Sequence, residues 1–252
     1  MRYLFDCWEE IARRIRAAKD IRLYLDFDGT LVGYRPRPEQ VKLREKTRAA
    51  LRRLAGHRCV HVAIVSGRRR KELAKLLRAP SVEFLGLYGW EDVDRVSLPA
   101  RTKLSLGKVR RALRILSKGM SGVFVEDKGI SVALHFRNAS TVVQRQAHER
   151  MRKIVRRFRG ELHVLPSHGV WDVVPNEVRG KGAAMRAALA RVRKPSLAIY
   201  AGDDVTDEPA FKVLSRGITV LVGEPRKTHA RYRLRDPLEV YAFLRLLEAE
   251  LL

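Results

Sequence analysis

Two aspartates follow an apolar run near the start of the chain, in the segment IRLYLDFDGTLVGY (residues 21–34). The run Ile21–Leu25 has the character of a buried strand, and Asp26 and Asp28 come directly after it. A carboxylate at the end of a buried strand must be hydrogen-bonded, serve in chemistry or hold a metal ion. By itself, this pair is equally compatible with two aspartates that cap a helix or form a turn.

Other polar side chains follow other predicted strands. Ser66 comes directly after the run VHVAIV (Val60–Val65), and the acidic segment GDDVTDE (Gly202–Glu208) follows Leu197–Ala201. In a doubly wound parallel sheet, ligands bind outside the carboxyl ends of the strands, so we expect these groups at one edge. Lys181, at the start of a predicted helix, is the cation expected to join them.

These residue types point to phosphoryl transfer. Several close carboxylates repel one another, and a bound divalent cation relieves the repulsion. Hard oxygen ligands that leave room for water and a substrate phosphate suit Mg²⁺. A carboxylate can also attack phosphorus to form an aspartyl phosphate, a reaction that needs mainly positioning and neutralisation of oxygens. The ordered set DxDGT, SGR, GK and GDDxTDE is therefore a much stronger signal than the first pair alone.

The spacing of apolar residues predicts an interrupted α/β fold. Strands alternate with helices in the first and last parts of the chain, which indicates a parallel sheet with right-handed crossovers. The middle part follows a helix, hairpin, helix, hairpin order, typical of a small α+β module: Leu104–Leu116, residues 123–137, Ser140–Phe158 and residues 161–174. We expect a Rossmann-like core of residues 1–97 and 178–252, with an inserted α+β domain at 98–177. The hinges are expected near residues 96–100 and 175–179.

The other predicted elements follow from the same periodicity. Helices are expected over residues 5–18, 42–54, 66–77, 180–192, 209–214 and 238–251, and strands over 21–25, 60–65, 84–87, 196–203 and 218–223. Ser66 lies at a position typical of a helix cap for the third of these helices.

The net charge of +24 comes from 52 Lys and Arg against 28 Asp and Glu. Basic residues lie along nearly every predicted helix, and no basic motif is interleaved with aromatics. This pattern favours a generally arginine-rich surface over a nucleic-acid site, with an anionic partner as the alternative. The chain has no apolar run of about 18 residues and no signal-peptide pattern at its start, which predicts a cytoplasmic protein without a membrane span. Two cysteines do not make a disulfide framework.

The segments LDFDGTL, VSGR, GKG and GDDVTDEPAF together resemble the haloacid dehalogenase (HAD) superfamily of phosphatases, over nearly the whole chain. Within that superfamily the chain looks most like the trehalose-6-phosphate phosphatases. The narrower resemblance rests on GDDVTDEPAF, on the hairpin VEDKGISVALHFRNA, and on GLYGWE, where the family usually has Gly-x-His-Gly-x-Glu. It implies Mg²⁺-dependent hydrolysis of trehalose 6-phosphate to trehalose and phosphate. The inserted module would be the cap domain that closes over the sugar.

The resemblance also implies catalytic roles. Asp26 would attack phosphorus and carry the covalent phosphate. Asp28 would protonate the leaving sugar oxygen and then deprotonate the attacking water. Thr30 would orient Asp28 or the phosphate, while Ser66 and Lys181 would hold phosphoryl oxygens.

Ligands for the metal and the sugar follow from the same resemblance. Carboxylate oxygens of Asp26 and Asp203 and the backbone carbonyl of Asp28 would bind Mg²⁺, with Asp204 and Asp207 in supporting positions. The candidates for contacting the substrate are Glu126, Lys128, His135, Arg137 and Arg68. Plainer interpretations remain: Glu126 and Lys128 as members of cross-strand salt bridges, His135 as an outward strand residue, and Asp204 as a helix cap.

Two departures concern the sugar. Tyr88 stands where the family usually has histidine, and WDVVP places Asp172 and Val174 where it usually has Glu-x-Arg-Pro. The expected small-molecule partner is a phosphorylated disaccharide, with a trehalose-phosphate synthase as a candidate protein partner. The alternatives are a phosphatase for another phosphorylated sugar or glycoside (sucrose phosphate or a glycosylglycerate phosphate), a nucleic-acid end phosphatase, and a non-catalytic domain that binds a sugar phosphate or a synthase.

Overall fold

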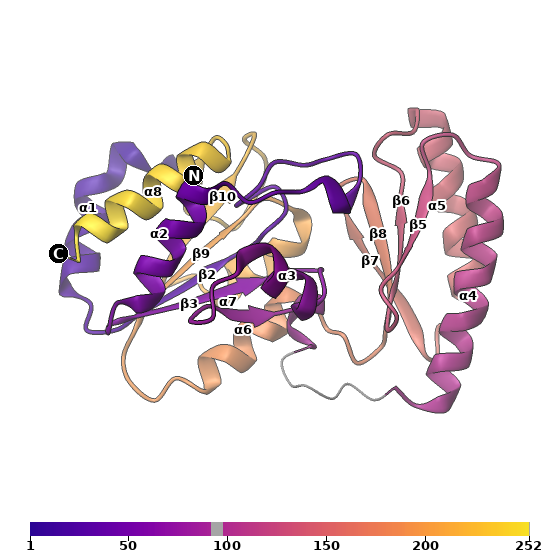
Figure 1. Cartoon of the computed structure of the whole chain (residues 1–252), viewed down its shortest axis with the longest axis horizontal. Coiled ribbons are helices and arrows are strands. Elements are labelled where there is room, and N and C mark those ends of the chain that lie inside the picture. Colours follow the sequence, from indigo (N-terminus) through magenta and orange to yellow (C-terminus); the bar gives the residue numbers. More distant parts are fainter. Residues whose placement is uncertain (92–97, 252) are drawn as a thin grey trace. The chain divides into compact units, whose positions relative to one another are not determined.

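The chain folds into two compact units. The computed structural model describes residues 1–91 and 98–251. The core unit comprises Met1–Asp92 and Arg179–Leu252, and the cap unit comprises Val93–Val178. The core unit contains a parallel sheet and the cap unit an antiparallel one (Figure 1), which confirms the predicted α/β fold class. The predicted hinge near residues 96–100 lies partly outside the described residues.

The core sheet has seven strands in the order β1-β11-β10-β9-β2-β3-β4, and its neighbouring strands are parallel. The strands are β1 (Arg2–Tyr3), β2 (Ile21–Leu25), β3 (Val60–Val65), β4 (Glu83–Leu85), β9 (Leu197–Gly202), β10 (Ile218–Val222) and β11 (Tyr232–Leu234). The central strand β2 pairs with β3 on one side and β9 on the other. Because these strands run in the same direction, their carboxyl ends meet at one edge of the sheet.

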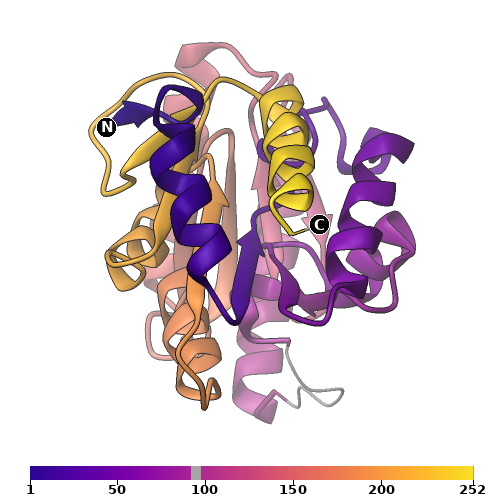
Figure 2. The ribbon, with the colours of Figure 1, turned by 90° about the vertical axis from the view of Figure 1, so that its left-hand side faces the viewer.

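Helices cover both faces of the core sheet. They are α1 (Trp8–Ala17), α2 (Glu45–Gly56), α3 (Arg70–Leu77), α6 (Lys181–Ala190), α7 (Glu208–Val213) and α8 (Pro237–Ala249), with 3₁₀ turns η1 (Phe5–Cys7), η2 (Pro38–Gln40), η3 (Leu87–Gly89) and η4 (Val205–Asp207). Leu23 of β2 packs in the apolar cluster that includes α1, α2, α3 and α8, whereas its neighbour Tyr24 packs with α6 and α7. Figure 2 shows α1 and α8 in front of the strands. Burial on both faces explains why these strands are nearly continuous apolar runs.

The cap unit pairs two helices with a four-stranded antiparallel sheet. Its elements are α4 (Ala100–Lys118), β5 (Phe124–Asp127), β6 (Val132–His135), α5 (Thr141–Arg156), β7 (Leu162–Ser167) and β8 (Val170–Pro175), and its strand order is β5-β6-β8-β7. Within this unit, α4 and α5 cover one face of the sheet (Figure 1). Trp171 lies on that face, where its ring stacks on His148 of α5. Since side chains alternate along a strand, Asp172 lies on the opposite face.

Two features differ from the sequence-based expectations. The strands β1 and β11 were not predicted, because runs of two and three residues with polar side chains carry no periodic signal. The prediction that Ser66 caps a helix is wrong: α3 begins at Arg70, its N-cap residue is Arg69, and the Ser66 hydroxyl accepts a bond from the backbone N–H of Arg68 at 3.2 Å. The Ser66 side chain thus shapes the loop before the helix.

Within the described ranges, no helix has the length and apolarity needed to cross a bilayer.

Candidate active site

A buried lysine bridges two carboxylates at the carboxyl edge of the core sheet. The Nζ atom of Lys181 lies 2.8 Å from Oδ1 of Asp26 and 2.8 Å from Oδ1 of Asp207. Asp26 directly follows β2, Asp207 ends the η4 turn after β9, and Lys181 begins α6. All three are buried. Burial opposes the charge of Lys181, but the carboxylates of Asp207 and Asp26 outweigh it and raise the pKa of Lys181, which therefore stays cationic.

Asp203 completes a cluster of three carboxylates. Oxygen atoms of Asp26, Asp203 and Asp207 all lie within 4.8 Å of one another. Thr30 donates its hydroxyl to Oδ1 of Asp203 at 3.4 Å, and Tyr34 donates to Oδ2. Burial, with the nearby charge of Asp207, raises the pKa of Asp203 to about 7. Burial also raises the pKa of Asp26 well above its usual range, against the opposing effect of Lys181.

The donor set suits a divalent cation. Three carboxylates face the one positive charge of Lys181, so the ionised cluster has an excess of negative charge. Burial and, after it, the neighbouring carboxylates raise the pKa values of Asp26 and Asp203. Every donor is a hard oxygen, which is the preference of Mg²⁺. The oxygens of Asp207 already accept bonds from Lys181, from the Tyr200 hydroxyl at 2.6 Å and from a backbone N–H at 2.9 Å. Asp207 is therefore better placed to hold Lys181 than to bind a metal ion.

Two glycines allow the carboxylates to approach the backbone. Gly29 has a φ of +91°, and a Cβ atom there would lie 2.1 Å from Oδ2 of Asp203. A Cβ at Gly202 would lie 2.3 Å from Cγ of Asp207. Side chains at these positions would displace the acidic cluster, which gives a steric reason for glycine in DGT and in GDD.

Asp28 lies in a separate ion pair. Its two carboxylate oxygens accept bonds from Nε and Nη2 of Arg68, at 2.6 and 2.9 Å. Arg68 also pairs with Glu72 and donates to the backbone oxygen of Pro38. A bidentate guanidinium–carboxylate contact fixes the orientation of the acid. The structure thus places Arg68, a predicted substrate contact, against the predicted proton donor.

Tyr88 lies against the loop that contains Ser66. Its backbone N–H donates to the Ser66 carbonyl at 2.8 Å, and its φ of +61° is unusual for a residue with a side chain. A Cβ atom built on Gly67 would lie 2.8 Å from the Tyr88 hydroxyl oxygen, so the phenol ring rests on this glycine. Tyr88 is buried. The tyrosine that replaces the family's histidine is therefore packed beside a predicted phosphate-binding residue.

The cap-unit candidates form their own contacts. Glu126 lies 2.7 Å from Nε2 of His135, and the His135 ring stacks on Phe124. Lys128 lies 2.8 Å from Asp172, and both of these side chains are buried. Their strand register places Glu126, Ala133 and Asp172 on the sheet face opposite α4 and α5.

Arg137 and Asp204 have structural contacts as well. Arg137 donates to the backbone oxygen of His168 at the turn between β7 and β8. Asp204 caps the η4 turn by accepting a bond from Val205 N–H, as the plainer interpretation of this residue predicted.

Sequence reasoning missed two tyrosines of the core site. Tyr34 and Tyr200 donate to Asp203 and Asp207. The signal for Tyr200 is a single hydroxyl-bearing residue in the apolar strand LAIYAG, whose partner follows seven positions later. Tyr34 directly follows DGTLVG, and nothing in its local sequence indicates a partner far along the chain.

Comparison with known proteins identifies first the fold and then the family of this chain. A C. albicans trehalose-6-phosphate phosphatase C-terminal domain superposes with a TM-score of 0.81 at 19% identity, covering 96% of each chain. A haloacid dehalogenase-like hydrolase from Bacteroides thetaiotaomicron superposes with a TM-score of 0.62 at 16% identity, covering 91% of this chain and all of the other. The fold is thus that of the haloacid dehalogenase-like hydrolases.

Sequence similarity identifies the family, which the structural comparison does not. The trehalose-phosphatase family model matches residues 24–237. Trehalose 6-phosphate phosphatase RA3 of Zea mays is 30% identical over 255 residues, which span 91% of this chain and 70% of the maize protein. The chain belongs to the trehalose-phosphatase family, as its sequence motifs predicted.

Gly29→Ala should lower enzyme activity far more than Gly33→Ala. The first change places a side chain at a left-handed backbone position and against Asp203, with roughly 1–3 kcal/mol of backbone strain. Gly33 lies in the same loop, but a Cβ atom there would meet nothing within 4 Å. Phosphate release and thermal unfolding of both variants check this expectation. Equal activity of the two variants would contradict the role given to Gly29.

Tyr200→Phe should lower kcat/KM by about tenfold, since it removes a hydrogen bond to a buried carboxylate that holds Lys181. Tyr232→Phe is a matched control, because the Tyr232 hydroxyl donates to Glu10 at 2.8 Å, outside the acidic cluster. We expect the control to keep wild-type kcat/KM. A similar loss of activity in both variants would indicate a general effect of lost stability.

Proposed function

We propose that this protein hydrolyses trehalose 6-phosphate to trehalose and phosphate, with Mg²⁺ and through a phosphate bound covalently to Asp26. The proposed chemistry rests on the cluster of Asp26, Asp203 and Asp207 around Lys181 at the carboxyl ends of β2 and β9. Membership of the trehalose-phosphatase family supports the choice of substrate.

In the first step, a carboxylate oxygen of Asp26 attacks phosphorus and the bond between phosphorus and the sugar oxygen breaks. The Lys181 ammonium contacts Oδ1 of Asp26, which leaves Oδ2 as the attacking atom. Asp28 gives its proton to the departing sugar oxygen, so trehalose leaves as a neutral alcohol. Both carboxylate oxygens of Asp28 accept bonds from Arg68 in this structure, so Asp28 must leave this contact before it can give a proton to the sugar oxygen.

In the second step, water attacks the phosphorus atom of the aspartyl phosphate. Asp28 takes a proton from this water, the bond between phosphorus and Asp26 breaks, and inorganic phosphate is released. Ser66 and Lys181 hold phosphoryl oxygens in both steps. The net reaction consumes one water and returns both aspartates to their starting states.

The metal site would use the carboxylates of Asp26 and Asp203 and the backbone carbonyl of Asp28. Bound Mg²⁺ supplies positive charge that neutralises phosphoryl oxygens and the acidic cluster. Thr30 and Tyr34 fix the orientation of Asp203 through its two oxygens. Asp207 holds Lys181, and Asp204 caps the η4 turn that ends at Asp207.

The cap unit would supply contacts to the sugar. Glu126, Lys128 and His135 lie on or beside the sheet face opposite α4 and α5, and hydroxyl-rich ligands are commonly bound by such charged and hydrogen-bonding groups. Arg137 is the further candidate of this unit. A cytoplasmic location and a trehalose-phosphate synthase partner stay predictions from the sequence.

A second candidate substrate is another phosphorylated disaccharide or glycoside. Val174 is fully buried and Asp172 is paired with Lys128, so the second hairpin presents no arginine where the family usually has one. The sugar site of this chain is therefore built from different groups, while the core cluster is unaffected.

Asp26→Asn should abolish phosphate release and covalent phosphorylation, because an amide is a poor nucleophile. Asp28→Asn should instead accumulate phosphoprotein with an aryl phosphate, whose leaving group needs no proton, since hydrolysis lacks its base. Acid quenching followed by intact-mass measurement detects the covalent phosphate. Asp6→Asn, at an exposed aspartate, serves as the control and should behave as wild type. Turnover by Asp26→Asn would overturn the mechanism.

Lys128→Ala should lower kcat/KM for trehalose 6-phosphate far more than for an aryl phosphate. Because Lys128→Ala also leaves Asp172 buried without its lysine, the double variant Lys128→Met/Asp172→Leu is needed to separate stability from recognition. Thermal unfolding identifies variants that are destabilised. If the double variant restores stability and the full preference for the disaccharide, Lys128 has a structural role only.

A further inference from the structure

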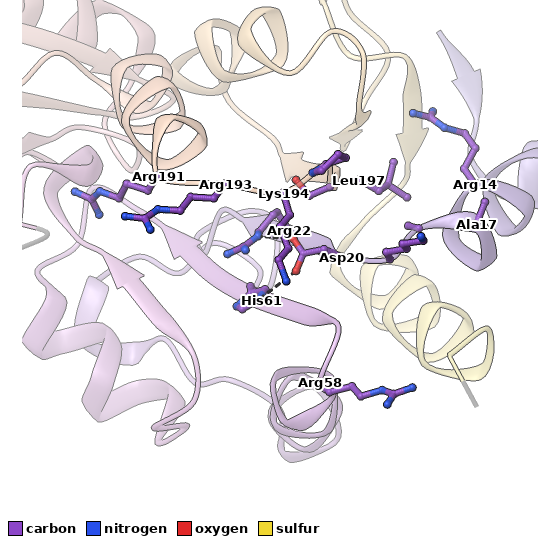
Figure 3. A pocket seen from close by; sticks show the side chains of 14 residues that line it. Arg14, Ala17, Asp20, Arg22, Arg58, His61, Arg191, Arg193, Lys194 and Leu197 are labelled. Atoms are coloured by element: carbon purple, nitrogen blue, oxygen red, sulfur yellow. Dashed lines mark hydrogen bonds and ion pairs between the residues drawn. The ribbon is translucent and has the colours of Figure 1, made fainter.

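A basic hollow lies at the amino ends of β2 and β9, at the end of the core sheet away from the acidic cluster (Figure 3). Its volume is about 1160 Å³. Seven of its fourteen lining residues are Lys or Arg, whereas 52 of the chain's 252 residues are. Lys and Arg are therefore more frequent in the lining of the hollow than in the chain as a whole. The basic groups come from α1, from the start of β2, from the loop before β3 and from the segment between α6 and β9.

Among the described residues, one acidic side chain lines the hollow, that of Asp20, and its charge is already compensated. Asp20 accepts a bond from Nε of Arg22 at 2.8 Å and lies 3.2 Å from Nε2 of His61; Figure 3 shows these three side chains together. Arg14 donates to the backbone oxygens of Arg216 and Gly217, which orients its guanidinium without cancelling its charge.

Four other cations of the hollow have no carboxylate partner among residues 1–91 and 98–251: Lys19, Arg58, Arg193 and Lys194. Like charges gathered in a concave surface repel one another and concentrate a positive potential there. An anion of several charges would relieve this repulsion, as a divalent cation would relieve it in the acidic cluster.

The lining residues also indicate the kind of anion. In the part of the chain that the structure describes, no Phe, Tyr or Trp lines the hollow, so these residues offer no aromatic platform for the base stacking that single-stranded nucleic acid uses. Arginine and lysine side chains instead match phosphate oxygens. The hollow is larger than a single phosphate needs, since pockets of about 300–1,000 Å³ hold drug-sized ligands. We infer that the basic hollow is a second binding site, for an anion that carries a chain of linked phosphates.

This site is separate from the active site. Four steps along the extended chain of β2 separate Arg22 in the hollow from Asp26 in the acidic cluster, a distance of about 13 Å. A ligand in the hollow therefore does not touch the acidic cluster. Inorganic polyphosphate and the triphosphate group of a nucleotide share the required chemistry.

The test is calorimetric titration of the full chain with tripolyphosphate, ATP, orthophosphate and a ten-residue uridine RNA, without divalent cations. Arg193→Glu/Lys194→Glu reverses two charges of the hollow. Lys46→Glu/Lys212→Glu makes the same change in net charge at exposed lysines of the core unit outside it.

Tripolyphosphate should bind with one site per chain, and its affinity should fall by at least about tenfold in Arg193→Glu/Lys194→Glu but by less than about twofold in the control. Asp26→Asn should leave this binding unchanged. Equal affinity for ATP would show that the phosphates alone are recognised, and tighter binding of ATP would identify a nucleotide as the source; both support the site. An equal loss in the control variant, equal binding of orthophosphate, or tighter binding of the RNA would overturn it.

Discussion

The contact of the Lys181 ammonium with Asp26 and Asp207 is the interaction on which the core site depends. Asp26 and Asp207 are buried and Asp203 is half-buried, and oxygens of the three carboxylates lie within 4.8 Å of one another. The cluster therefore needs compensating positive charge, and Lys181 supplies part of it. The surrounding sequence follows from this requirement. Glycines at 29 and 202 leave room for the carboxylates, and the hydroxyl of Tyr200 supports Asp207. The negative charge that Lys181 does not compensate makes the cluster suitable for a divalent cation and a phosphoryl group.

Opposite charges lie at the two ends of the same strands. The carboxyl ends of β2 and β9 carry the acidic cluster, whereas their amino ends border the basic hollow. A parallel sheet makes this possible, because all strands direct their carboxyl ends to one edge. Charge is therefore not spread evenly over the core unit. The acidic cluster proposed for catalysis is negatively charged, whereas the inferred polyphosphate site is positively charged. The strands of the core sheet separate the two regions.

The sequence predicted the elements that are buried on both sides. The bounds of β2 and β3 agree to the residue, because continuous apolar runs between polar ends mark central parallel strands. It also predicted that Asp26, Asp203, Asp207 and Lys181 lie at one edge of the sheet, because the acidic segments follow β2 and β9 and parallel strands end at the same edge. Contacts between distant residues could not be predicted from the sequence. The donation of Tyr34 to Asp203 and the pairing of Arg68 with Asp28 depend on loop conformations. The left-handed backbone of Tyr88 likewise depends on the packing of its ring against Gly67.

The most direct test of the central claim is a comparison of kcat/KM, with Mg²⁺ present, for four phosphomonoesters. These are trehalose 6-phosphate, sucrose 6-phosphate, glucose 6-phosphate and a 3′-phosphorylated oligonucleotide, measured by phosphate release from the purified full chain. Our account predicts a clear preference for trehalose 6-phosphate, despite Tyr88 and Val174. Efficient turnover of another substrate in the set, with little activity on trehalose 6-phosphate, would contradict it.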